Sequence, residues 1–200
     1  MSSMLESLAG QLGGDFTRQV GQQVGVDSNT VATVLSAGLP MLLGGLSRNA
    51  ANPQGAEALF GALQRDHDGG ILDMLGGGLP QNALADGMGI LGHVFGGRQS
   101  ALQNSLGRST GIDAATVGRI LAMAAPIVLG YLGRMQRQKN LDPGGLSDVL
   151  GREARQVDEQ QPGSMGMLNS ILDSDGDGDV DLSDMLRHGA GIFGKFFGGR

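Results

Sequence analysis

The residues with the clearest chemical spacing in the sequence are six aspartates near its end. Read from Asp173 as the first position, the sequence is DSDGDGDVDLSD, with carboxylates at positions one, three, five, nine and twelve and Gly178 at position six. Oxygen ligands at these positions, with a glycine that permits a sharp turn, are typical of a calcium loop. We therefore predict Ca²⁺ as cofactor, bound by Asp173, Asp175, Asp177, the backbone carbonyl of Asp179, Asp181 and Asp184.

The twelfth position of this loop departs from the usual EF-hand pattern. Asp184 stands where a glutamate usually chelates Ca²⁺ with both oxygens, and its side chain is one methylene shorter. The loop thereby resembles those of cellulosomal dockerins and other bacterial calcium-binding repeats, although no second complete loop is present. The alternative is a solvated acidic turn, in which crowded carboxylates repel one another because no cation is bound.

A second segment, residues 64–75, looks like half of such a loop. Asp66, Asp68, Gly69 and Ile71 occupy positions three, five, six and eight, while Gln64 stands at position one. Two acids alone do not make a strong site, so a metal site here requires Asp73 or a distant acid. The favoured interpretation is a turn that ends a helix.

No pattern in the sequence indicates catalysis. His67, His93 and His188 lie at no recognised ligand spacing, so each is expected on the surface or in a loop. There is no G-x-S-x-G elbow, no complete Walker loop and no G-x-G-x-x-G after a strand. We predict that the protein is not an enzyme.

Composition favours an all-α fold. Aromatic residues make up 4% of the chain and Trp is absent, so Leu, Ile, Val, Met and Ala must form the core, which suits packing of helix against helix. The 37 glycines far exceed a usual share of about 7%. They predict close approach of helix backbones, flexible loops, or some of each.

Charge, cysteine content and apolar runs indicate a soluble protein. The net charge is −6, and no Cys is present, which excludes disulfides and thiolate chemistry. The first residues lack the basic region of a secretory signal. The longest apolar runs, 39–46 and 120–132, are shorter than a span of about 20 residues and each contains a proline. We expect a cytoplasmic protein without a membrane span.

An internal repeat organises the chain. Residues 25–48 align without gaps on residues 111–134, with ten of twenty-four positions identical. In each copy an aspartate, Asp27 or Asp113, is the predicted N-cap of a long apolar helix. Pro40 and Pro126 lie near the middle of these helices, where proline should kink or break them. Duplication of one helical unit explains the pattern.

Each long helix is followed by a second, proline-led helix. Asn52 and Asp142 are the predicted caps, with Pro53 and Pro143 at the first helical position. We divide the chain into a first unit (1–75), a Gly-rich connector (76–89), a second unit (90–154), a polar linker (155–166) and a calcium-loop tail (167–200), which is expected to form a helical hairpin. The end of the tail, GIFGKFFGGR, echoes ILGHVFGGR at residues 90–98.

The sequence resembles a bacterial family of unknown function, domain of unknown function 937. The stretches that carry the resemblance are the QLGG start, GVDSNTV to GLPMLLGGLSRNA, QRDHDGGILDML, GILGHVFGGRQ, LAMAAPIVLGYLG and the FFGGR end. Membership implies a helical bacterial protein without an established activity. It implies no catalytic residues.

We therefore expect a structural or interaction protein that binds a protein partner or itself. The alternative is a DNA-associated regulator, because residues 22–35 and 106–121 have the texture of helix-turn-helix segments. Their second helices run into apolar stretches, and only Arg119 offers a basic side chain to DNA. The apolar residues of 192–197 predict docking onto the protein's own core, with oligomer contact or weak membrane contact as competitors.

Overall fold

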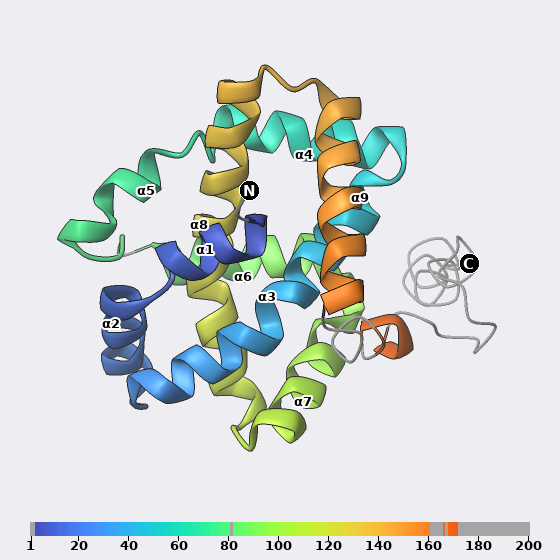
Figure 1. The fold of residues 1–200 in the computed structure, drawn as a ribbon. Helices are drawn as coiled ribbons and strands as arrows, with labels where there is room; N and C mark the ends of the chain where they lie inside the picture. Colours follow the sequence, from blue (N-terminus) through green and yellow to red (C-terminus); the bar gives the residue numbers. More distant parts are fainter. Residues whose placement is uncertain (1–2, 81, 161–165, 167, 172–200) are drawn as a thin grey trace, which may run out of the picture.

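The fold is all-helical, as the composition predicts. The computed structural model describes residues 3–80, 82–160, 166 and 168–171, and no strand occurs among them. The helices are α1 Met4–Gln11, α2 Gly14–Val24, α3 Ser28–Ala50, α4 Pro53–Arg65, α5 Gly70–Met74, α6 Ala83–Phe95, α7 Gln99–Thr110, α8 Ala114–Lys139 and α9 Pro143–Gln160, with single 3₁₀ turns at Leu75–Gly77 and Gly96–Arg98 (Figure 1).

The two long helices of the repeat, α3 and α8, form the centre of the core. They cross where Gly38 faces Leu121, and a methyl group at Gly38 would overlap the Leu121 side chain. The other helices pack around this pair: α2 and α7 contact both, α9 lies on α3, and α6 lies on α8. Part of the glycine excess therefore serves close helix packing.

Both central helices are long and apolar enough to cross a membrane by length and composition alone. In the fold, 67% of the apolar window of α3 and 78% of that of α8 are buried by neighbouring helices. Burial on all sides is also what a core helix requires. A buried core helix and a membrane-spanning helix therefore share this length and hydropathy.

The turns that lead into α3 and α8 are built alike, down to their hydrogen bonds. Gly25 and Gly111 have φ angles of 81° and 75°, in the left-handed region where glycine is favoured. The N–H of each donates to the carbonyl of Gly21 or Gly107 at 2.9 Å. These matching turns support duplication of one helical unit.

The predicted helix caps are confirmed. The carboxylate of Asp27 accepts from the N–H of Thr30 at 3.0 Å, and that of Asp113 accepts from the N–H of Thr116 at 2.9 Å. The shorter helices α4 and α9 begin at Pro53 and Pro143, as predicted. Their caps are the side chains of Asn52 and Asp142, which accept from the N–H groups of Gly55 and Gly145, three residues further on, at 2.7 Å.

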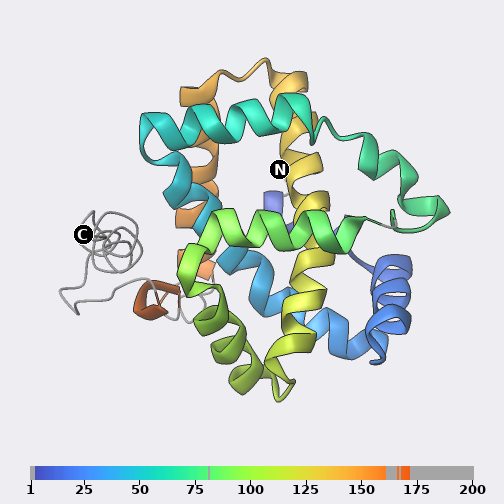
Figure 2. The ribbon, with the colours of Figure 1, turned by 180° about the vertical axis from the view of Figure 1, so that it is seen from behind.

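Neither long helix breaks at its proline, so of the two predicted effects, a kink or a break, the break does not occur. Helix α3 continues through Pro40 and α8 through Pro126, and both prolines are buried. Figures 1 and 2 show α3 changing direction along its length. Burial of both helices among their neighbours compensates for the hydrogen bond that each proline removes.

The carbonyl group freed by Pro126 lies at a close helix contact. Pro126 has no N–H for the carbonyl of Ala122, four residues earlier. Gly87 of α6 packs directly against this carbonyl, so close that a methyl group at Gly87 would overlap the Ala122 backbone. The absence of a side chain at Gly87 thus allows α6 to cover the freed carbonyl of α8.

Two helices extend into segments predicted as a connector and a linker. The connector predicted at 76–89 contains the start of α6, because Ala83 and Gly87 lie one turn apart and are buried. The linker predicted at 155–166 contains the end of α9, since Val157 is buried in the same core. The buried residues of both units and Leu168 form one hydrophobic cluster.

The duplication extends beyond the sequence match. Met4, Leu8 and Leu12 are buried at intervals of four before a Gly-Gly pair, in the same pattern as Gly87, Leu91 and Phe95, so α1 corresponds to α6. The sequence GILDM of α5 corresponds to GMLNS at residues 166–170, and the central leucines Leu72 and Leu168 are both buried. Each copy therefore comprises five helical segments.

Candidate functional site

The predicted calcium ligands lie outside the described residues. Asp173, Asp175, Asp177, Asp179, Asp181 and Asp184 all follow Ile171, the last residue that the structure describes. The calcium loop therefore stays a prediction from the spacing of the carboxylates. The structure does describe the related half-loop after α4.

This half-loop is a turn between two helices, as the favoured interpretation predicts. Helix α4 ends at Arg65 and α5 begins at Gly70. The turn depends on Gly69, whose φ is 96° and which lies against α8, where a methyl group would come within 2.9 Å of the Arg134 side chain. The carboxylate of Asp68 accepts from the N–H of Gly70 at 3.0 Å. The turn is closed by its own backbone and side chains.

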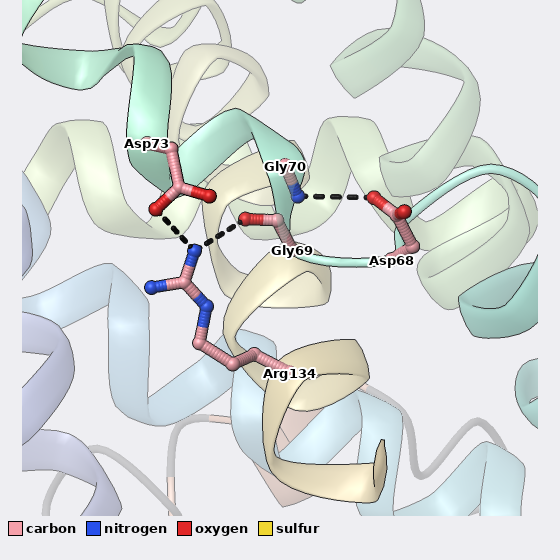
Figure 3. A network of polar contacts seen from close by, with 5 residues as sticks. All are labelled: Asp68, Gly69, Gly70, Asp73 and Arg134. Atoms are coloured by element: carbon pink, nitrogen blue, oxygen red, sulfur yellow. Dashed lines mark hydrogen bonds and ion pairs between the residues drawn. The ribbon is translucent and has the colours of Figure 1, made fainter. Parts of the chain in front are cut away.

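Two arginines of α8 pair with Asp68 of the turn and Asp73 of α5, and Figure 3 shows the contacts of one of them, Arg134. Nη2 of Arg134 donates to the carbonyl of Gly69 at 2.9 Å and to Oδ1 of Asp73 at 2.7 Å. Nη1 of Arg137 lies 3.3 Å from Oδ2 of Asp68. The Gly70 hydrogen bond, and after it Arg137, lower the pKa of Asp68.

The three aspartates Asp66, Asp68 and Asp73 have different partners. Within the described ranges, no group of three His, Asp or Glu side chains could hold a metal ion. Asp66 closes the C-terminal end of α4, whereas Asp68 and Asp73 are paired with different arginines. Positive charges of α8 therefore lie beside two of the three carboxylates.

Arg48 occupies the position of α3 that corresponds to Arg134 of α8. Its Nη2 donates to the side-chain oxygen of Asn169. Asn169 lies in the short segment after α9, and Asp73 lies in the corresponding segment after α4. Each long helix thus holds the short helix of the other copy. The sequence repeat pairs the two arginines, but pairing alone does not reveal that they bind across the copies.

A cleft lined by residues of α3, α4, α6 and α8 lies between α4 and α6; Figure 2 shows the ribbon of these two helices. The cleft encloses about 950 Å³, and its floor includes Leu46 and Leu129. The other lining residues are Asn49, Asn52, Gly55, Ala58, Leu59, Ala62, Arg65, Asp66, His67, Asp86, Gly89, Ile90, His93 and Val94. Hydrophobic periodicity did not reveal this cleft, because it forms only where α4 and α6 face each other.

One end of the cleft is acidic and contains a half-buried histidine. Burial lowers the pKa of His67, and the nearby carboxylates of Asp66 and Asp86 oppose that shift without cancelling it. His93 lies exposed near the other end, where Asn49 donates to the carbonyl of Val94 at 3.2 Å. Neither histidine belongs to a group of three His, Asp or Glu side chains that could hold a metal in the described part of the chain. His188 lies outside that part.

The cleft combines an apolar interior with charged residues. Leu59, Ile90 and Val94 are partly buried and pack against the core, while the charged groups are placed at the rim. A ligand here would lie on apolar side chains and be oriented by the rim.

The predicted helix-turn-helix segments correspond to α2 with α3 and α7 with α8. On α3, the exposed residues of the first three turns are uncharged: Ser28, Asn29, Ala32, Thr33 and Ser36. On α8, Arg119 is exposed while its neighbours Gly118 and Ile120 are buried. The exposed polar side chains of α3 are not accompanied by basic ones, and the start of α8 presents Arg119 as its basic side chain, whereas phosphate contacts rely largely on basic residues.

The described residues form an all-helical, internally duplicated protein. Arg48 and Arg134 each connect the long helix of one copy to the other copy, and an apolar cleft lies between α4 and α6. The chain belongs to the bacterial family of proteins of unknown function DUF937, whose family model matches residues 6–135. That match covers both α3 and nearly all of α8. Comparison with curated proteins and with solved structures finds no match.

Proposed function

We propose that the protein is a non-enzymatic interaction protein that binds Ca²⁺ through residues 173–184. The observation that carries this proposal is the spacing of carboxylates at positions one, three, five, nine and twelve, with Gly178 at the turn. All are oxygen ligands, which suit Ca²⁺. Val180 at position eight offers an apolar side chain that can anchor the loop.

In the half-loop after α4, two aspartates are paired with arginines of α8. There, Arg134 and Arg137 pair with Asp73 and Asp68. Residues 173–184 contain six aspartates and no Lys or Arg, and Arg187 is the nearest basic residue in the sequence. Repulsion among so many carboxylates favours a bound divalent cation.

The interaction role is supported by apolar surface on the described helices. Met74 of α5 and Met88 of α6 are 57% and 44% exposed, and Leu84 lies one turn from Met88. Methionine adapts its shape to different partners. Sedimentation velocity across a concentration series measures self-association: a growing sedimentation coefficient supports it, whereas a monomer throughout restricts the role to a different protein partner.

Calcium binding should stabilise the folded protein. If the unfolded chain does not bind Ca²⁺, a concentration one hundred times the dissociation constant adds about 2.7 kcal/mol to the free energy of unfolding. Asp173→Ala or Asp184→Ala should remove most of this gain. Mg²⁺ should stabilise less, because it requires a smaller octahedral cage and loses its water reluctantly.

Isothermal titration and calorimetric melts test the proposal directly. Wild type, Asp173→Ala and Asp184→Ala are compared in calcium and in chelator. The matched control is Asp148→Ala, which removes one exposed carboxylate from α9 and should leave the calcium response intact. Identical melts of wild type in calcium and chelator, with no heat of binding, would reduce the segment to a solvated acidic turn.

A further inference from the structure

We propose that the segment of residues 192–200 docks in the cleft between α4 and α6 of its own chain. The floor and walls of the cleft include Leu46, Leu59 and Ile90, and its volume is about 950 Å³. The segment concentrates apolar side chains of matching character: Ile192, Phe193, Phe196 and Phe197. The proposal does not depend on calcium binding.

The described chain ends beside the cleft. Asn169 accepts a hydrogen bond from Arg48, and the next residue of α3, Asn49, lines the cleft near Val94. In Figures 1 and 2 the short helix of residues 168–171 lies beside the start of α7, which follows α6 directly. The chain therefore leaves the described structure near the His93 end of the cleft.

The intervening chain is long enough to reach every part of the cleft. Residues 185–191, which follow the proposed calcium loop, alone span up to about 23 Å when extended. Asp86 and His93 of α6 mark the two ends, seven residues and thus about 10 Å apart along the helix. In a helical form, residues 192–200 measure about 12 Å, which matches that length.

Charge fixes the direction in which the segment enters. Ile192 would lie near Asn49 and His93, where the rim carries no carboxylate, and Arg200 would lie at the other end. That end carries Asp66 and Asp86, both exposed and both near His67, together with the exposed Arg65, so two carboxylates and one guanidinium leave a formal charge of −1 there. Arg200 can therefore pair with these carboxylates while the phenylalanines cover the apolar floor.

The absence of cysteine allows a direct proximity test in the full-length chain. In Ala58→Cys/Phe197→Cys, a disulfide requires the two Cα atoms to come within about 7 Å. The control pair, Ala32→Cys/Phe197→Cys, uses an exposed position near the start of α3, away from the cleft. We expect oxidation to close the first pair roughly tenfold faster than the control. Equal rates in the two pairs would overturn the proposal.

Two further measurements keep the test specific. Arg200→Glu should slow disulfide formation in Ala58→Cys/Phe197→Cys, and adding Asp86→Arg should restore the rate. If neither change alters the rate of disulfide formation, the proposed orientation is excluded. A mixture of the single variants Ala58→Cys and Phe197→Cys detects docking between chains. Dimers that form as fast as the intramolecular bond would assign the cleft to a second copy and overturn docking in cis. Circular dichroism verifies that each variant keeps its helices.

Discussion

Arg134 and Asp73 are 61 residues apart in the sequence, and Nη2 of Arg134 lies 2.7 Å from Oδ1 of Asp73. The pair joins α8 of the second copy to α5 of the first. Arg48 and Asn169 make the reciprocal connection from α3 to the segment after α9. The long helix of each copy therefore contacts the other copy, so the copies pack against each other and are not placed end to end.

The first prediction concerns the strength of this connection. Arg134 and Asp73 are 35% and 74% exposed, so solvent screens their attraction and their coupling energy should be about 0.2–1 kcal/mol. Arg134→Ala should cost about 1–2 kcal/mol, because it also removes the hydrogen bond to the Gly69 carbonyl. Urea unfolding of both single variants and the double variant measures the coupling.

The matched control for this cycle is Arg18 with Asp15, an exposed pair within α2 at 2.6 Å. Loss of that pair removes only a contact within one helix, so Arg18→Ala should cost less than Arg134→Ala. A larger cost for Arg18→Ala would show that the contacts of Arg134 between the copies add no more to the free energy of unfolding than a surface ion pair does.

The second prediction concerns the glycine contact between α6 and α8. Gly87→Ala places a methyl group into the Ala122 carbonyl and should destabilise the protein by about 1–3 kcal/mol. Gly89→Ala, two residues away with open space around it, should instead stabilise α6 by up to about 1 kcal/mol. Thermal melts that shift in the same direction for both variants would contradict this account.

The third prediction tests the duplication energetically. A methyl group at Gly21 or Gly107 would lie 2.6 Å from the carbonyl oxygen of Val26 or Ile112, in the two equivalent turns. We expect Gly21→Ala and Gly107→Ala to lower the melting temperature by similar amounts. Gly10→Ala, where nothing lies within 4 Å, is the control and should not lower it. Effects that differ several-fold between the two turns would argue against equivalent roles.

The fourth prediction concerns pH. Burial lowers the pKa of His67 in the folded protein below its ordinary value of about 6.5, so the unfolded chain takes up the proton first as pH falls. The contribution of neutral His67 to the free energy of unfolding is therefore fully present above about pH 6.5 and is lost as the pH falls below that value. Urea unfolding at pH 7.5, 6.5 and 5.5 should show a decline that His67→Gln reduces. His93→Gln, at an exposed position, should retain the decline.

Local structure was largely determined by the sequence. Asp27, Asp113 and Asn52 cap helices because each side chain accepts backbone N–H groups only a few residues away. Gly25 and Gly111 end the preceding helices because glycine alone enters the left-handed region at little cost. Such interactions need no distant partner, so residue type and spacing predict them. The carboxylate spacing of residues 173–184 likewise predicts a ligand set from the sequence alone.

Only the tertiary structure decided the features that depend on distant residues. The helices continue through Pro40 and Pro126 because neighbouring helices bury them, and α6 begins at Ala83 because α8 covers that turn. Asp68 and Asp73 pair with arginines from α8, since folding places two positive charges beside them. The cleft between α4 and α6 exists only where two helices from different copies face each other. None of these contacts leaves a local pattern, because each partner lies far away in the chain.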